Sequence, residues 1–334
     1  MKRQLFLLIA LFFTAGGLSA AERIVISAPG PRNISYLPVD LISKIGADKE
    51  EGVELQVLHT GGGAVALNNL VTGNADFAVA GMPAAMSQHA KGGDVMAIAA
   101  INDAPLFVLM VRAELSNKVK TIADLKGKVI GVNTSTRNSK TTSQQLVELL
   151  LKSGGVALDS VRIVPAGQSW VEQSSLILSG AADAVMGDEP FASRLLKERK
   201  VFFLVNLAEP ETTKSINGAH FLHAVLVTRS DIIKNQPGKA EKMVRIMRKS
   251  LQWINNHSAD EIANRLGITD RDERQSLVDA LKKYRRIYTT DGKFSTNQLK
   301  ETELFFHTSS AGDPTAENLH IEQMVDDRWV GRTR

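Results

Sequence analysis

The chain has 334 residues, of which 43% are hydrophobic, and its formal net charge is +4 at pH 7. This hydrophobic content is ordinary for a globular protein, and the length exceeds one common domain, so we expect two domains. The charge is too small to indicate a nucleic-acid-binding protein, and the absence of cysteine excludes disulfides, thiol nucleophiles and cysteine metal sites.

Residues 1–21 have the layout of a secretory signal peptide. Lys2 and Arg3 precede an apolar run at 5–13, and small residues at 19–21 come just before the first acidic residue, Glu22. The run is too short to span a bilayer, and no later segment is long and apolar enough to cross one. We therefore expect cleavage after Ala20 or Ala21. Because the lipoprotein cysteine is missing, we expect a freely soluble periplasmic protein without a membrane anchor. A buried first helix is the alternative.

The first third of the chain alternates apolar strands with amphipathic helices. Strands are predicted at 24–27, 53–58, 76–80 and 95–100, and helices at 36–47, 64–71 and 83–92. This alternation predicts α/β units with a largely parallel sheet, in which ligands bind beyond the carboxyl ends of the strands. The three glycines at 61–63 precede a helix and would let a ligand approach the backbone closely, unless they form an ordinary flexible turn.

The stretch 124–140 predicts a strand, a polar loop and a helix in that order. Residues 128–132 form a short apolar run, 133–138 are hydroxyls and amides with one arginine, and Leu146, Leu149 and Leu150 recur at helical spacing. The loop lies at the amino end of a helix, where unpaired N–H groups and partial positive charge favour an anion. An ordinary capped helix is the alternative.

The rest of the chain continues the alternation and then becomes helical. An apolar run occupies 106–111, and later strands are predicted at 161–164, 182–186, 201–205 and 223–228, with helices at 171–179 and 191–200. Two apolar stripes at 243–254 and 277–284 indicate core-facing helices rather than a cofactor surface.

Four short motifs together resemble a known protein family. They are Leu-Lys-Gly-Lys-Val-Ile-Gly-Val at 125–132, Gly-Gly-Gly at 61–63, Gly-Asn-Ala-Asp-Phe-Ala at 73–78, and Gly-Ala-Ala-Asp-Ala-Val at 180–185 followed by Glu189-Pro190. In this order they resemble periplasmic substrate-binding proteins of ABC importers, in the group that binds nitrate, sulfonates, taurine and thiamine precursors. The resemblance covers nearly the whole chain after the signal peptide.

The resemblance implies a two-lobed periplasmic-binding fold of type II, α/β in class, with a mostly parallel sheet flanked by helices in each lobe. The first lobe would be discontinuous, at 22–111 and 226–334, and the second would be 112–225. The implied function is capture of a small anion, organic or inorganic, between the lobes. The implied partner is an inner-membrane ABC permease, and the protein would be a monomer without a cofactor.

Loops after predicted strands supply the candidate ligand-binding residues. Those of the first lobe are Arg32, Asn33, Ser35, Tyr36, Gly62, Gly63, Gly81 and Met82. Those of the second lobe are Thr134, Ser135, Thr136, Arg137, Trp170 and Asp188. An arginine holds a carboxylate or sulfonate by two hydrogen bonds, and an aromatic side chain stacks on a flat ring. The alternatives are solvated arginines and a tryptophan that packs inside its own lobe.

No catalytic constellation is found, so we expect a protein that is not an enzyme. His220 and His223 are close in sequence, but on a strand they would point to opposite faces, which argues against a metal pair. Related enzymes on this fold need a cysteine, which is absent. The family often has tryptophan before the Glu-Pro pair, whereas this chain has Asp188, which removes an aromatic wall and adds a carboxylate. A periplasmic sensor subunit, or a binding protein for a pyrimidine or aromatic precursor, remains an alternative function.

Overall fold

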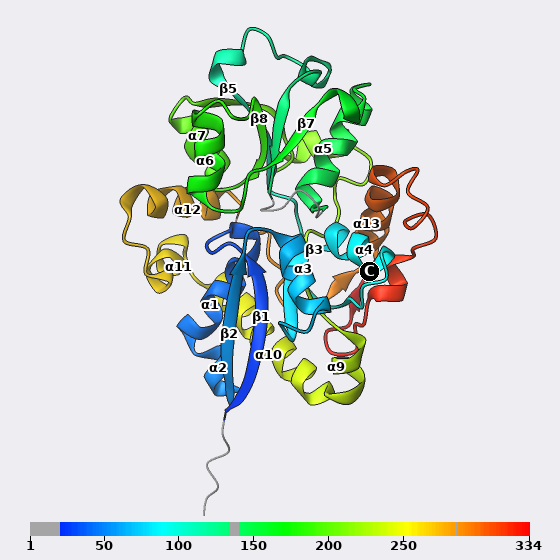
Figure 1. Cartoon of the computed structure of the whole chain (residues 1–334). Helices are drawn as coiled ribbons and strands as arrows, with labels where there is room; N and C mark the ends of the chain where they lie inside the picture. Colours follow the sequence, from blue (N-terminus) through cyan, green and yellow to red (C-terminus); the bar gives the residue numbers. More distant parts are fainter. Residues whose placement is uncertain (1–20, 134–139, 285) are drawn as a thin grey trace, which may run out of the picture.

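The computed structural model describes residues 21–133, 140–284 and 286–334, whose longer strands form two separate five-stranded sheets. Figure 1 shows the second sheet and its helices, in teal and green, above the first sheet, whose leading strands are blue. We call each sheet with its flanking helices a lobe. The α/β fold with two lobes that the sequence predicts is confirmed. Among the described residues, no helix has both the length and the apolar character needed to cross a membrane.

The first sheet has the order β2-β1-β3-β10-β4. Its strands are β1 (Glu22–Pro29), β2 (Val53–Thr60), β3 (Phe77–Gly81), β4 (Met96–Asn102) and β10 (Ala224–Thr228). β1 runs parallel to β2 and β3, whereas β10 is antiparallel to both of its neighbours. Its helices from the first part of the chain are α1 (Leu37–Ile45), α2 (Ala47–Glu50), α3 (Gly63–Val71) and α4 (Met82–Ala90). The sheet is therefore completed by a strand that comes from more than a hundred residues later in the chain.

The second sheet repeats this plan in the order β7-β6-β8-β5-β9. Its strands are β5 (Phe107–Arg112), β6 (Val129–Val132), β7 (Arg162–Pro165), β8 (Ala184–Asp188) and β9 (Val201–Asn206). Its helices are α5 (Thr142–Ser153), α6 (Trp170–Leu178), α7 (Phe191–Lys197) and α8 (Pro210–Lys214). Short 3-10 helices connect the elements: η2 (Ala113–Leu115), η3 (Ile122–Leu125) and η4 (Leu158–Ser160).

β5 lies in the second sheet, whereas the expected division places residues 107–111 in the first lobe. It pairs with β8 and β9. Phe107, Leu109 and Val111 enter the core on one side of this sheet, and Val108 and Met110 enter the core on the other. A strand that is buried on both faces looks the same in either sheet, so its sequence does not say which one it joins. We propose that the first crossing between lobes is at 103–106 and the return precedes β10.

The chain after β10 is mostly helical and packs largely on the first lobe. Its elements are α9 (Ser230–Asn235), α10 (Pro237–Asn256), α11 (Ala259–Leu266), α12 (Arg271–Lys283), α13 (Thr296–Ser309), η5 (Ile321–Met324), β11 (Phe294–Ser295) and β12 (Arg332–Thr333). The predicted stripe on α10 is confirmed as core, because Met243, Ile246 and Leu251 are fully buried. In Figure 1, α12 and α13 lie on opposite sides of the junction, where they contact α7 and α5 of the second lobe.

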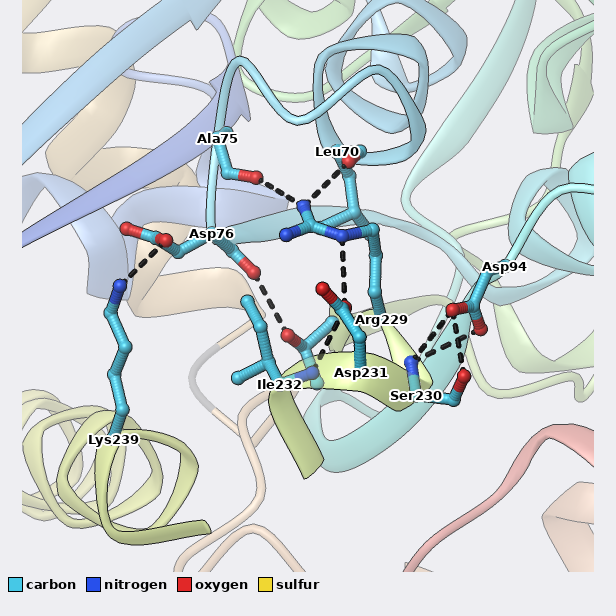
Figure 2. Close-up of polar contacts among 10 residues, drawn as sticks. Leu70, Ala75, Asp76, Asp94, Arg229, Ser230, Asp231, Ile232 and Lys239 are labelled. Carbon is cyan, nitrogen blue, oxygen red and sulfur yellow. Dashed lines mark hydrogen bonds and ion pairs between the residues drawn. The ribbon is translucent and has the colours of Figure 1, made fainter. Parts of the chain in front are cut away.

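The aspartate of the motif at 73–78 holds the returning strand in the first sheet (Figure 2). Asp76 accepts a hydrogen bond from the Val25 amide at 2.9 Å and pairs with Lys239 at 2.6 Å, and its carbonyl accepts one from the Thr228 hydroxyl at 2.8 Å. Arg229 donates to the carbonyls of Leu70 and Ala75, both at 2.9 Å. This motif therefore stabilises the fold at the end of β10.

The motif at 180–185 stabilises the fold of the second lobe in a similar way. Asp183 accepts a hydrogen bond from the Val129 amide at 2.9 Å, and its own amide donates to the Val129 carbonyl at 2.8 Å. Arg112 pairs with Asp183 at 3.2 Å. Each motif thus fixes a parallel strand pair from the start of a strand.

Candidate functional site

The ends of strands from both lobes meet at one small cavity. β3 ends at Gly81 in the first lobe and leads directly into α4, and β6 ends at Val132 in the second lobe. The cavity is lined by Tyr36, Gly63, Gly81, Ala84, Phe107, Asn133, Thr141, Thr142, Ser143 and Gln168. About 20 Å³ of it is accessible to water, which is room for one water molecule. The lobes are therefore closed over this position.

A larger hollow of about 560 Å³ lies elsewhere on the first lobe, beside Trp253 at the end of α10. The Trp253 and His257 rings stack there, with their centroids 3.9 Å apart. It is open and is lined by helices alone, away from the carboxyl ends of the strands. Ligands of parallel α/β sheets bind at those strand ends, so we assign the site to the smaller cavity between the lobes.

The wall from the first lobe is built by the loop after β1 and by η1 (Ile34–Tyr36). Asn33 caps η1, since its Oδ1 accepts a hydrogen bond from the Ser35 amide at 2.9 Å. Tyr36 is buried against His223, with 5.9 Å between ring centroids. Burial and, to a smaller extent, the nearby Asp188 carboxylate raise the pKa of Tyr36 well above its usual value, while a hydrogen bond with the Gly81 backbone acts in the opposite direction. Tyr36 is therefore neutral at pH 7.

Arg32 lies outside the cavity wall. Its guanidinium pairs with Glu273 of α12 at 2.5 Å, and its side chain is 41% exposed. Its amide donates to Asp40 at 2.8 Å, which holds the loop onto α1. The structure thus gives Arg32 a position at the rim, and the expected ion pair between Arg32 and a bound anion stays a prediction.

The glycines and Met82 shape the cavity through the backbone. Gly62 and Gly63 begin α3, and Gly63 lines the cavity. A Cβ atom on Gly81 would overlap the hydroxyl of Thr142 and lie 3.1 Å from its Cβ, so the two lobes touch here. Met82 is buried in the core of the first lobe, and its amide donates to the His223 carbonyl at 2.6 Å. Met82 therefore supports the wall without lining it.

The amino end of α5 supplies the wall from the second lobe. Thr141 caps this helix, with 3.4 Å from its hydroxyl to the Gln144 amide. The Ser143 hydroxyl accepts a hydrogen bond from the Asn133 amide at 2.8 Å. The expected anion-binding residues Thr134, Ser135, Thr136 and Arg137 lie between these positions, outside the described residues.

A network of amide side chains joins the lobes beside the cavity. The Nδ2 atom of Asn33 donates to the Gln168 Oε1 at 2.9 Å and also to the Asp188 Oδ2. Gln168 in turn donates to the Asn133 carbonyl at 3.1 Å, and Gln173 donates to the Asp188 Oδ1 at 3.3 Å. The network joins the loop after β1 to the ends of β6 and β8 and to α6.

Asp188 is the acidic member of this network. Burial raises its pKa to about 6, although hydrogen bonds from Gln173 and Asn33 act to lower it, and the neighbouring Glu189 adds a further upward shift. Asp188 is consequently mostly ionised at pH 7 and partly protonated near pH 6. Burial also lowers the pKa of His223 to about 3, so its ring is neutral.

Several polar atoms at this junction have no hydrogen-bond partner among the described residues. They are the hydroxyls of Ser35 and Thr142, the side-chain nitrogen and oxygen of Asn133, the side-chain oxygen of Gln173, and Nδ1 of His223. An unpaired buried polar group costs about 1–3 kcal/mol, so clusters of them are uncommon in a finished core. Such a cluster indicates a place where a solute completes the hydrogen bonding.

Trp170 packs inside the second lobe, which is the alternative left open by the sequence. It begins α6 after a capping box formed by Ser169 and Glu172. Its ring centroid lies 6.3 Å from that of Phe191, and the Arg194 guanidinium lies 4.0 Å from the Trp170 centroid. Trp170 does not line the cavity. The aromatic surface there comes from Tyr36 and Phe107.

Sequence reasoning missed Thr142, Gln168, Gln173, His223 and Phe107. Gln168 belongs to the loop after a predicted strand, so the rule that found the other candidates could have included it, and Thr142 begins the helix that follows such a loop. Gln173 lies within a helix and His223 at the start of a strand, and no sequence signal distinguishes them from core residues. Among the described residues, no group of three or more acidic or histidine side chains could hold a metal ion.

The family model described as "NMT1/THI5 like" matches residues 49–261. A curated Bacillus subtilis (strain 168) protein, YtlA, named only provisionally as a binding protein, is 23% identical over 307 residues and matches 88% of this chain and 85% of its own. A solved structure from Bordetella bronchiseptica RB50 has a TM-score of 0.83 at 23% identity, covering 92% of this chain and 95% of that one.

The alkanesulfonate-binding protein SsuA from Xanthomonas axonopodis pv. citri, solved with bound MOPS, has a TM-score of 0.70 at 14% identity. The match covers 94% of this chain and all of that chain (100%). At these identities the structural likeness shows the fold. Together with the family match, it confirms the resemblance stated from the sequence.

Proposed function

Because the chain belongs to the NMT1/THI5-like family, we propose that it is the periplasmic solute-binding component of an ABC importer. It would capture a small polar solute between its lobes and deliver it to an inner-membrane permease. The observation that carries this proposal is the group of partnerless polar atoms where strand ends of both lobes meet. Binding without catalysis also agrees with the names of SsuA and YtlA.

Contacts between the lobes support capture by closure. Besides the amide network, Gln145 of α5 bonds to Ser87 at 3.2 Å and to Ser309 at 3.3 Å, and Lys283 pairs with Glu209 at 2.5 Å. These named contacts are polar, so each of them is weak enough to break and re-form. A solute that touches both lobes gains its full set of contacts only in the closed form and would favour it.

The charge of the solute is supported less directly than its capture between the lobes. The sequence favours an anion such as a sulfonate, taurine or nitrate, and SsuA is an alkanesulfonate-binding protein. The amino end of α5, which faces the cavity, also favours negative charge. If an anion is held by Arg137, then Arg137→Ala should weaken its binding by about 1.5–3 kcal/mol, the range for a hydrogen bond to a charged group. Calorimetric titration measures this change.

Small-angle scattering tests capture between the lobes. The purified protein is screened by thermal shift against small anions, amino acids and heterocycles, and a binder is confirmed by calorimetry. We expect the confirmed binder to reduce the radius of gyration, because it closes the lobes. A confirmed binder that leaves the radius unchanged would place the site on one lobe and contradict the proposed mechanism.

A further inference from the structure

One end of the second lobe combines cations that lack ion-pair partners with exposed leucines. We call it the basic end and define it as residues 112–128, 157–162, 178–183 and 196–201. We propose that the basic end docks onto an anionic lipid bilayer and so holds the protein at a membrane surface. This inference goes beyond the proposed function and does not depend on which solute is bound. It is carried by the position of the basic end, by its charge and by its apolar side chains.

The basic end lies opposite the cavity. β6 runs from it toward Asn133, which lines the cavity, so the two are at opposite ends of the same strand. Backbone hydrogen bonds join its separate segments: the Arg162 amide donates to the Lys128 carbonyl, and the Ala113 amide to the Lys200 carbonyl, both at 3.0 Å. Figure 1 shows its first segment, in teal, at the top of the molecule and away from the blue strands of the first sheet. A bilayer in contact with the basic end would therefore leave the junction between the lobes uncovered.

Cations outnumber acids at the basic end. Those on loops and strand ends are Lys118, Lys120, Lys126, Lys128, Arg162, Arg199 and Lys200, and none of them forms an ion pair with a described residue. Two acids are neutralised, since Asp183 pairs with Arg112 at 3.2 Å and Glu198 pairs with Arg194 at 3.4 Å. The acids that remain are Glu114, Asp124 and Asp159. The basic end therefore carries an excess of positive charge that is largely open to solvent.

The first lobe shows the contrasting arrangement. Lys239, Lys242 and Lys249 of α10 each pair with a carboxylate, at 2.6 to 2.8 Å. A paired cation gains less from a lipid phosphate, because its charge is already compensated. Each unpaired lysine or arginine at an anionic bilayer strengthens binding about fivefold. The distribution of ion pairs thus favours the basic end over the first lobe as the face that meets an anionic surface.

Exposed leucines accompany these cations. Leu158 is 50% exposed, Leu178 53% and Leu196 42%, and they are three of the five exposed large apolar side chains among the described residues. Leu158 belongs to η4, which is held beside the cations at 126–128 because the Gly127 amide donates to the Ser160 carbonyl at 2.7 Å. Binding at a bilayer interface combines apolar side chains that enter the headgroup region with cations that attract anionic lipids. A nucleic acid would use the cations alone, so the leucines favour a bilayer.

Vesicle co-sedimentation tests the proposal on the protein recovered from a periplasmic extract. Vesicles of phosphatidylglycerol and phosphatidylcholine in equal parts are compared with vesicles of phosphatidylcholine alone. The protein should bind the anionic vesicles at least tenfold more tightly, and binding should weaken as sodium chloride is added, because salt screens surface charge. Equal binding to both kinds of vesicle, or none to the anionic vesicles at low salt, would overturn the proposal. Binding to a short DNA duplex without binding to vesicles would also overturn it and would assign the basic end to a polyanion.

A matched pair of double variants locates the attraction. Lys126→Gln with Arg162→Gln removes two exposed cations of the basic end and should weaken binding to the anionic vesicles about tenfold or more. Lys234→Gln with Lys300→Gln removes two exposed cations of the chain after β10, which also lack an ion pair with a described residue, and should change binding less than threefold. Equal losses would mean that net charge alone attracts the protein, and the basic end would then be no docking surface. All variants keep the wild-type amino terminus, and thermal unfolding confirms that each is folded.

A second matched pair tests whether a leucine enters the bilayer. Leu158→Ser should weaken binding to the anionic vesicles at least threefold, because an apolar side chain no longer leaves water. Leu304→Ser is the control, since Leu304 is 46% exposed on α13, outside the basic end, and its replacement should leave binding unchanged. If Leu158→Ser binds the vesicles as tightly as the wild-type protein, the leucine stays in water and the assignment of a bilayer as the partner is wrong.

Discussion

Arg32 has a left-handed backbone conformation, with φ at +62°. This conformation costs a residue with a side chain about 1–2 kcal/mol, and glycine avoids that cost. The loop keeps it because the Arg32 amide bonds to Asp40 and the guanidinium pairs with Glu273. Arg32→Ala removes the ion pair alone, whereas Arg32→Gly also removes the strain.

We therefore expect Arg32→Gly to be more stable than Arg32→Ala by up to about 1 kcal/mol, after the flexibility of glycine is allowed for. Urea denaturation of the two variants measures the difference. Because Arg32 lies at the rim, neither substitution should change solute affinity by more than a few tenths of a kcal/mol. A larger loss of affinity in both variants would instead give Arg32 the anion-binding role that its loop position suggests in the sequence.

Asp188 predicts a pH dependence of stability. Its pKa is about 6 in the folded protein, above its ordinary value of 3.8, so the folded state binds more protons than the unfolded state between these values. The contribution of Asp188 to stability therefore falls as pH rises from about 4 to about 6 and stays low above that. Tyr36 is neutral in this range, and Glu189, whose pKa burial also raises, titrates in wild type and variant alike.

The stability gained by Asp188→Asn over wild type should consequently grow from pH 4 to pH 6 and then level off. Chemical denaturation at several pH values measures this difference. A difference that stays constant from pH 4 to pH 8 would mean that the carboxylate is solvated in the folded protein, and that the lobes are open in solution.

At the scale of elements, the end of β3 and the start of α5 are in close contact across the junction between the lobes. Gly81 has φ −65° and ψ 135°, which any residue adopts, so alanine there adds no backbone strain. Its Cβ would, however, overlap Thr142 across the junction. We expect Gly81→Ala to weaken solute binding at least tenfold while the unfolding free energy changes by less than about 1 kcal/mol, because the open form has room for the methyl group.

Gly63→Ala is the matched control for that prediction. Gly63 lines the same cavity, but a Cβ there would lie 3.4 Å from Ala80 of the same lobe, a tolerable contact. Calorimetry and denaturation are measured for both variants. If both weaken binding equally, the effect comes from filling the cavity and the closure interpretation is wrong. If adding Thr142→Ala to the Gly81→Ala variant partly restored solute binding, this result would support the closure interpretation.

Whether a segment forms a helix or a strand could be predicted from the sequence, because local hydrophobic patterns determine it. The predicted strand 76–80 is β3, and the stripe at 243–254 is the buried face of α10. Which sheet a strand joins could not be predicted from these patterns. β5 and β10 are buried on both faces, and their partner strands are distant in sequence. The loops after strands led to Asn33, Tyr36, Gly81 and Asp188, which lie at the junction between the lobes, and their role in binding stays a prediction. The pairing of Asn33 with Gln168 could not be predicted, since it depends on how the two lobes close.

At the scale of the whole molecule, Glu22, the residue that follows the expected signal peptide, is part of the first sheet. The Glu22 amide donates to the Gly52 carbonyl at 2.9 Å, and its carboxylate pairs with Lys242 at 2.8 Å. Glu22 is also the first residue of β1, in register with Val53 of β2. These contacts belong to Glu22 itself, so cleavage after Ala20 or Ala21 would leave the first sheet intact, with β1 at the new amino terminus.

We therefore expect the exported protein to start at Ala21 or Glu22 and to be as stable as a chain that retains residues 1–20. Intact-mass spectrometry of the protein from a periplasmic extract identifies the terminus, and denaturation of recombinant chains that start at Met1 and at Glu22 compares their stability. A periplasmic mass that includes residues 1–20 would contradict the cleavage. A Glu22 chain that is several kcal/mol less stable would show that the leader takes part in the fold, as a buried first helix would.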